Sequence, residues 1–253
     1  MSGTQLGSKG KLGLYGKVPC MGDFVVRRLN GEFVNNWDLW LQDCIANSRQ
    51  LLGSSWLDQY LTAPIWRFVI GPNVLGDNAW IGIMVPSVDR VGRYFPLTLA
   101  QPINPDIDIL TTYLDNTGWF QSLENIGMDA LGQNINFEEY ESNLSEFPAP
   151  VEIVDRDTAE NTIPTLKKVF LSSYFNLPVK LEGDDTDYMS PVRNIISNSL
   201  QPTSLWGAEW FEKREHILLA TENLPDKERF CSFLDQDFGT HGWSDVLKNE
   251  VAE

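Results

Sequence analysis

Residues Ile65–Val85 read IWRFVIGPNVLGDNAWIGIMV, and this stretch decides the fold class. Its two apolar runs, Ile65–Ile70 and Ala79–Val85, are short, rich in β-branched and aromatic residues, and separated by turn residues, which predicts a β-hairpin. Pro86 ends the second run, because proline cannot donate a hydrogen bond to a sheet. After a loop, Phe95–Ala100 is a third apolar run and a further expected strand.

Helical patterns lie on both sides of these strands. From Phe33 to Leu52 the apolar residues recur at the spacing of one helix face, and Gly53 is a natural end for that helix. Helices and strands alternate along the chain, and several neighbouring strands form hairpins, so we expect an α/β layered domain with a mixed or antiparallel sheet. The other expected elements are strands at Leu12–Gly16, Ser204–Trp206 and Ile217–Ala220, and helices at Trp56–Leu61, Ile107–Ile126 and Lys227–Phe238.

The composition predicts a folded chain with an acidic surface, which either serves solubility or faces a basic protein. Nine Trp, thirteen Phe and seven Tyr among 253 residues supply too much apolar surface for a disordered chain. The net charge is −16, and it is uneven: residues 1–105 carry nine Lys and Arg against seven Asp and Glu, whereas residues 106–253 carry ten against twenty-eight. Such an acidic body repels phosphate backbones and anionic lipids, so nucleic acid and membranes are excluded as expected partners. A partner protein with a basic surface is compatible with this charge.

The sequence also predicts a cytoplasmic location. No apolar run approaches the ~20 residues needed to cross a bilayer, and the polar, glycine-rich start lacks the apolar core of a secretory signal. Cys20, Cys44 and Cys231 are odd in number and widely spaced, which fits neither a disulfide framework nor a metal motif. Cys44 lies on the apolar stripe of a predicted helix, which favours a buried free thiol.

We expect one domain over residues 12–240, between a flexible N-terminus (1–11) and a C-terminal tail (241–253). Its first part, 12–103, is rich in motifs, and its second part, 104–240, is acidic. Residues 130–190 are expected to hold an insertion, of which Asn134–Pro150 is acidic, weakly periodic and expected to be exposed. Further expectations in or near this region are a strand at Val151–Val154, a loop at Leu177–Ser190 and a helix at Pro191–Leu200.

Motifs for catalysis, cofactors and metals are absent from the sequence. The two histidines, His216 and His241, have no partners at ligand spacing, and no G-x-S-x-G elbow or G-x-G-x-x-G loop occurs. Gly16-Lys17 resembles the end of a nucleotide-binding P-loop, but Val18 replaces the required Ser or Thr. We therefore predict no catalytic residue, no cofactor and no metal site.

Seven charged residues stand in otherwise apolar or Gly/Pro-rich stretches. A charge in such a place must be paired or exposed, since burying it alone costs several kcal/mol. One hypothesis is an Asp–Arg network that clamps the loop after Pro86 against the loop ending at Asp23. The other is an exposed patch for carboxylates or phosphates of a partner, with Asp23 and Arg93 structural and Arg90 pointing outward. The candidate residues are Asp23, Arg27, Arg28, Arg67, Asp89, Arg90 and Arg93, with Tyr94 between them and the third strand.

Two segments carry a specific pattern. The first contains G-K-x-P, G-D-F and W-D-x-W-L between Gly16 and Leu41, and the second contains P-x-W-R-F at Pro64–Phe68 and P-S-x-D-R-x-G-R-x-F-P-L-T at Pro86–Thr98. In this order the motifs resemble the N-terminal signature of TagF, a family of type VI secretion-associated proteins, and the resemblance covers residues 12–103. A weaker echo follows at SLWGAEW and NLPDKERFCSFL, where Gly207 replaces a second Trp and Asn223 a Gly.

The resemblance implies a fold and a role. TagF proteins are post-translational repressors of type VI secretion, linked to the forkhead-associated (Fha) scaffold protein of the apparatus and in some bacteria fused to a PppA-type phosphatase. The implied fold is a three-layer α/β/α sandwich with a mixed, largely antiparallel sheet. The implied function is non-catalytic, through binding of the Fha protein. Two alternatives stay open: an adaptor that recruits a PppA-type phosphatase to a phosphorylated scaffold, and an unrecognised enzyme that uses the Asp/Arg cluster.

Overall fold

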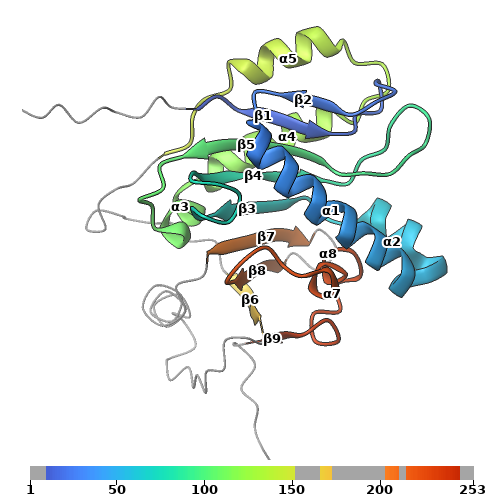
Figure 1. Ribbon diagram of the computed structural model, residues 1–253, viewed down its shortest axis with the longest axis vertical. Coiled ribbons are helices and arrows are strands. Elements are labelled where there is room, and N and C mark those ends of the chain that lie inside the picture. Colours follow the sequence, from blue (N-terminus) through green and yellow to red (C-terminus); the bar gives the residue numbers. More distant parts are fainter. Residues whose placement is uncertain (1–9, 152–165, 173–202, 211–214, 246–253) are drawn as a thin grey trace, which may run out of the picture.

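The computed structural model describes residues 10–151, 166–172, 203–210 and 215–245. In these parts of the chain the strands form one nine-stranded sheet, in the order β2-β1-β5-β4-β3-β7-β8-β6-β9 (Figure 1). The strands are β1 (Gly13–Gly16), β2 (Val25–Arg27), β3 (Trp66–Ile70), β4 (Ala79–Val85), β5 (Leu97–Ile103), β6 (Leu166–Ser172), β7 (Ser204–Trp210), β8 (Glu215–Thr221) and β9 (Trp243–Asp245).

The sheet is mixed and largely antiparallel, as predicted. The expected hairpin is present, with β3 and β4 paired from Trp66↔Met84 to Ile70↔Trp80. Of the described pairs, only β6 and β8 run parallel. The middle strand, β3, has β4 on one side and β7 on the other, so the sheet joins the first half of the chain directly to the second.

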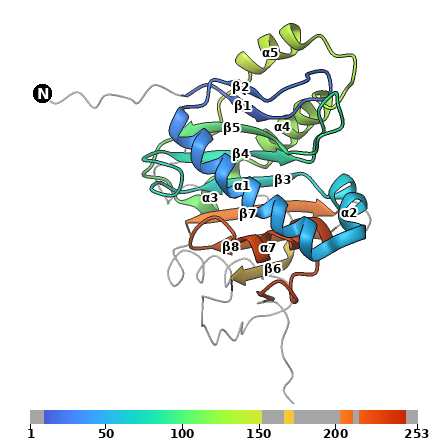
Figure 2. The ribbon, with the colours of Figure 1, turned by 45° about the vertical axis from the view of Figure 1, so that its right-hand side comes forward.

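Helices cover both faces of the sheet, which confirms the three-layer sandwich. Figures 1 and 2 show α1 crossing one face and α4 lying against the other. On the first face α1, α2, α7 and α8 pack on the sheet, and on the second face α3, α4 and α5 do. The helices are α1 (Gly31–Leu52), the 3-10 turn η1 (Gly53–Ser55), α2 (Trp56–Thr62), α3 (Ile109–Asp115), α4 (Thr117–Asp129), α5 (Phe137–Ser145), α7 (Lys227–Phe230) and α8 (Ser232–Asp235).

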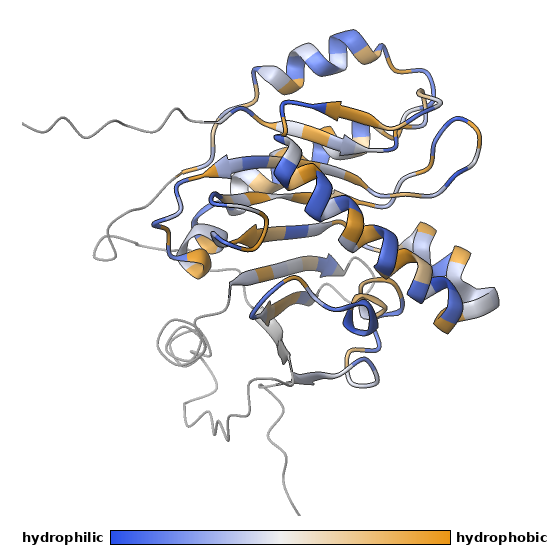
Figure 3. Ribbon diagram, viewed as in Figure 1, coloured by the Kyte–Doolittle hydropathy of each residue, from blue (hydrophilic) through white to orange (hydrophobic). Residues whose placement is uncertain are grey.

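The long helix α1 has the signals that start and stop a helix. The Asn30 side chain accepts a hydrogen bond from the Phe33 amide at 2.8 Å and so caps the first turn. Gly53 follows the last turn at φ 52°, a conformation that glycine adopts without strain. Between these ends hydrophobic and hydrophilic residues alternate along the helix (Figure 3). One stripe of the helix is buried against the sheet, and it includes Phe33, Trp37 and Leu41.

The α1 face of the sheet has an aromatic core. Trp37, Trp66 and Trp80 are fully buried, while Trp40 is half-buried and donates from Nε1 to the Pro225 carbonyl at 2.7 Å. Trp37 stacks on Trp206 with ring centroids 5.9 Å apart. A ring from α1 thus packs against a ring from β7, so the two halves of the chain share this core.

Three segments differ from the sequence prediction. Part of Asn134–Pro150, expected as an exposed insertion, is helix α5, whose Tyr140 and Leu144 are buried in the core. The expected helix Lys227–Phe238 is two short helices, although Phe230, Phe233 and Leu234 are buried as expected. The expected tail from residue 241 contributes β9, which pairs with β6. Val151 is exposed and outside any strand; residues 152–154 and the elements expected at Leu177–Ser190 and Pro191–Leu200 lie outside the described residues.

Gly207 on β7 explains one departure from the TagF pattern. A Cβ atom at this position would lie 1.7 Å from the hydroxyl of the buried Tyr113. Since the Tyr113 ring fills the space above the strand, a tryptophan cannot stand here unless that ring moves. Within the described residues, none of the helices has the combination of length and hydropathy that spanning a membrane requires.

Candidate functional site

Two loops lie side by side at one end of the sheet and carry most of the motif residues. One joins β1 to β2 (residues 17–24) and the other joins β4 to β5 (residues 86–96). They meet because β1 and β5 are neighbours, with Gly16 opposite Leu97. The Arg90 amide donates to the Met21 carbonyl at 3.0 Å and joins the loops directly. We call residues 17–24 and 87–94 together the two-loop surface (Figure 1).

Asp89 is the centre of the two-loop surface. Its carboxylate is fully buried and accepts from Lys17 Nζ and Arg93 Nε, both at 2.6 Å. The amides of Val91 and Arg93 donate to its other oxygen at 3.0 Å and 2.9 Å. Lys17 is buried as well, with 5% of its side chain exposed. One carboxylate thus fixes the shape of its own loop and holds the neighbouring loop through Lys17.

The pKa of Asp89 reflects these contacts. Burial acts to raise it, but the hydrogen bonds from Lys17, Arg93 and the Val91 amide outweigh burial and hold the pKa of Asp89 well below its usual range. A carboxylate so committed does not take up a proton near neutral pH. Asp89 is therefore unsuited to act as a general base.

This depressed pKa predicts a particular pH dependence of stability. A group whose folded pKa lies below its unfolded value of about 3.9 stabilises the fold above that pH and loses the contribution as the pH falls toward the folded pKa. We expect the difference in unfolding free energy between wild type and Asp89→Asn to be constant from neutral pH down to about 5, and to shrink below about 4. Urea titrations at several pH values measure it. A difference that stays constant down to pH ~2 would contradict the role of Asp89.

The outer side of the two-loop surface presents two arginines and apolar groups. Val91 is 66% exposed and Phe24 42% exposed, which is unusual for such residues. Arg93 is tied to Asp89 and also donates from Nη2 to the Gly22 carbonyl at 2.5 Å. Arg90 is exposed, and no hydrogen bond or ion pair to the described residues engages its guanidinium group. Arg90 therefore has the outward orientation that was predicted from the sequence.

The other predicted candidates belong to different sites. Asp23 is exposed and accepts only from the amide of its neighbour Phe24 among the described residues, so it is not part of the clamp; Lys17 takes that role. Arg27 and Arg28 both bind Glu141 on α5 at 3.0 Å.

The two remaining candidates also lie outside the clamp. Arg67 binds Glu124 on α4 through two hydrogen bonds, at 2.6 Å and 2.8 Å. Tyr94 is half-buried and packs edge-on against Trp56 and Tyr60. Seven of the eight predicted residues thus divide into a clamp, an exposed surface and two ties between the sheet and the second-face helices, and the eighth, Tyr94, packs on α2.

Lys17 is the functional residue that sequence reasoning missed. It stands in the G-K-x-P motif, next to Val18, whose presence argues against a nucleotide-binding P-loop. A lysine in an otherwise apolar and Gly/Pro-rich stretch has the same signal as the arginines that were selected, since it too must be paired or exposed. In the described part of the chain, no three His, Cys, Asp or Glu side chains gather in a way that could hold a metal ion.

The sequence and the layered α/β fold each have a relative among known proteins. Residues 13–147 match the sequence profile described as the TagF N-terminal domain, type VI secretion system-associated. The crystal structure of PA0076 from Pseudomonas aeruginosa PAO1 is similar over 96% of this chain and 97% of that chain, with 30% sequence identity and a TM-score of 0.68. No curated protein matches the sequence.

This chain belongs to the TagF family. The matched profile covers more than half of it, and the likeness to PA0076 continues beyond the profile into the second half of the sheet. Its role is therefore connected with type VI secretion. The resemblance inferred from the motifs is confirmed.

Proposed function

We propose that this chain is a non-catalytic, cytoplasmic repressor of type VI secretion that binds the Fha scaffold protein of the apparatus. Membership of the TagF family supports the connection with type VI secretion. The observation that carries the proposal is the two-loop surface, in which a buried ion pair fixes a loop whose tip exposes Arg90 and Val91.

The make-up of this surface supports binding rather than catalysis. Arginine and aromatic side chains at the centre of a rigid patch are typical of interface hot spots, and Arg90 is of this kind. A surface that is already ordered loses little conformational entropy when a partner binds. Asp89, the buried acid of the site, is fully engaged by Lys17 and Arg93, so it has no proton-transfer role to offer. The guanidinium group of Arg90 could bind a carboxylate or phosphate of the partner, because these groups accept two parallel hydrogen bonds from an arginine.

The test is a binding measurement between this chain and purified Fha protein, by calorimetry. We expect Arg90→Ala to weaken binding by about tenfold, since hot-spot truncations cost more than about 1 kcal/mol. The unfolding midpoint should change little, because the exposed Arg90 side chain lies beside Gly22 but makes no hydrogen bond or ion pair with the described residues. Lys11→Ala is the matched control: it also removes one exposed cation, at the opposite end of β1 from the loops.

Each outcome of this experiment bears on one part of the proposal. Equal affinity of Arg90→Ala and wild type would contradict the two-loop surface as the contact site. No binding of wild type, with or without phosphothreonine on the Fha protein, would contradict the Fha protein as the partner. Binding only when a PppA-type phosphatase is also present would favour the adaptor. Unaltered type VI secretion after both deletion and overexpression of the gene would contradict repression itself.

A further inference from the structure

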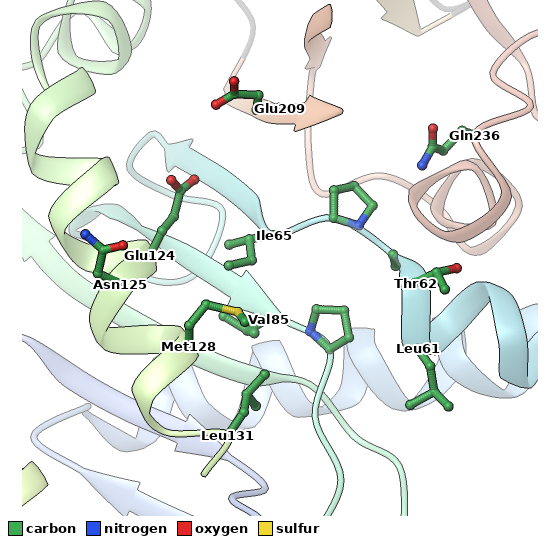
Figure 4. A pocket seen from close by; sticks show the side chains of 13 residues that line it. Leu61, Thr62, Ile65, Val85, Glu124, Asn125, Met128, Leu131, Glu209 and Gln236 are labelled. Carbon is green, nitrogen blue, oxygen red and sulfur yellow. The ribbon is translucent and has the colours of Figure 1, made fainter. Parts of the chain in front are cut away.

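A groove lies beside the end of β4, where Pro86 begins the loop to β5. One wall of the groove is the end of α2 and the chain that follows it, and the opposite wall is α4; the end of β4 lies between them (Figure 4). The volume of the groove is about 500 Å³. The floor is apolar and consists of Ile65, Val85, Pro86 and Leu131. An open groove with such a floor has room for side chains of another molecule.

Exposed apolar side chains stand at the edges of this groove. Leu61 at the end of α2 and Met128 at the end of α4 are each 54% exposed. Leu57, one helical turn before Leu61, is 39% exposed. Exposed side chains of this size, grouped around a concave surface, leave apolar area that a partner can remove from water, which favours binding. Methionine in particular adapts its shape to different partners.

One end of the groove is acidic. Glu124 and Glu209 lie there, and among the residues that the structure describes no Lys or Arg lines the groove. The charge of Glu124 is balanced by Arg67, which binds it through two hydrogen bonds. Glu209 makes no hydrogen bond or ion pair with the described residues, but its charge also acts on Arg67, so one guanidinium group faces two carboxylates. This end of the groove therefore keeps a net negative charge, and the Glu209 carboxylate has no direct hydrogen-bond partner among the described residues. An apolar floor with one available carboxylate at its end selects an apolar group next to a cation.

We propose that this groove is a second docking site, which binds an amphipathic helical segment of a partner protein. Two apolar side chains of the segment, one helical turn apart, would lie between Leu61 and Met128, and a Lys or Arg of the segment would reach Glu209. Helix-in-groove binding has this pattern of anchors. A basic segment also suits the charge of the chain, −16 overall, whereas a second copy of this acidic chain does not. The inference does not depend on the Fha protein being the partner.

The probe is a phage-displayed library of 16-residue helical peptides with randomised positions, selected on the full-length protein. We expect the selected peptides to share two apolar residues at i and i+4 or i+3 and at least one Lys or Arg. Synthetic copies are then measured by fluorescence anisotropy. Met128→Glu is expected to weaken their binding by about tenfold or more, because it places a charge at the apolar edge of the groove.

Two further variants make the test specific. Glu209→Gln is expected to weaken binding of the basic peptides by about threefold to tenfold and to reduce its dependence on salt. Leu39→Glu is the matched control, since Leu39 on α1 is 68% exposed and does not line the groove. It should leave binding unchanged.

Other outcomes would overturn the proposal. They are a library that yields no binder, selected peptides that are acidic, and selected peptides that bind Met128→Glu and wild type equally well. Thermal unfolding of each variant checks that the fold is kept. The result is independent of the calorimetry with the Fha protein: peptides that bind the groove while the Fha protein fails to bind would contradict the proposed function alone. The reverse pattern would contradict the groove alone.

Discussion

Asp89→Ala is expected to lower the free energy of unfolding by about 3–5 kcal/mol, the cost of leaving a buried charge without its partner. The charge left behind is that of Lys17, whose side chain is 5% exposed. The substitution also frees the amides of Val91 and Arg93, which both donate to the carboxylate. Urea unfolding, followed by tryptophan fluorescence, measures the change.

A matched pair of variants identifies the cause of this loss. Lys17→Met combined with Asp89→Ala removes both charges, so we expect the double variant to be more stable than Asp89→Ala alone. Asp23→Ala, on the same surface, should change stability by less than about 0.5 kcal/mol, since Asp23 is exposed and, within the described parts of the chain, bonds only to its neighbour Phe24. A large loss for Asp23→Ala, or additive losses for Lys17 and Asp89, would show that the clamp has been assigned to the wrong residues.

Trp37→Ala is the second substitution with a large expected effect, about 3–5 kcal/mol of unfolding free energy, as is usual for removing a buried tryptophan. Trp37 has no exposed surface and its ring packs against Phe68 and Trp206. Its Nε1 donates to Thr98 Oγ1 at 2.8 Å, a buried hydrogen bond that the variant also loses. The measurement is the midpoint and slope of urea unfolding.

Two variants on the same helix are the controls. Trp37→Phe keeps most of the ring packing and loses the hydrogen bond to Thr98, so its cost should be smaller, about 1–3 kcal/mol. Leu39→Ala, two residues along α1, truncates a side chain that is 68% exposed and should cost less than about 0.5 kcal/mol. If Trp37→Ala proved as mild as Leu39→Ala, the aromatic core would not stabilise the fold in the way described.

The sequence predicts the parts of the fold that depend on local patterns. The hairpin of β3 and β4 follows from two apolar runs around a turn, and α1 follows from its apolar periodicity and its Asn30 and Gly53 ends. What it misses depends on distant partners. Helix α5 is acidic and weakly periodic, and it is held because Glu141 meets Arg27 and Arg28 and because Tyr140 and Leu144 reach the core. None of these contacts is visible within the segment itself.

The candidate site divides in the same way. The sequence selects the right residue types, since a charge in an apolar stretch must be paired or exposed, and Arg90 and Asp89 illustrate the two outcomes. It cannot select the pairs. Arg67 and Glu124 come together only because β3 and α4 pack face to face, and Asp89 meets Lys17 only because β5 lies next to β1. The groove with Glu209 is likewise formed by segments from both halves of the chain.

The central position of β3 has a practical consequence for shortened forms of the protein. A fragment limited to the profile match, 13–147, would lack β7, so the backbone groups on one side of β3 would have no hydrogen-bond partners. Phe68 and Trp37 would also lose their contacts with Trp206. An unpaired strand edge next to solvent-exposed aromatic rings favours self-association over folding. Expression fragments should therefore extend through β8, and the end of the profile should not be taken as the end of a folding unit.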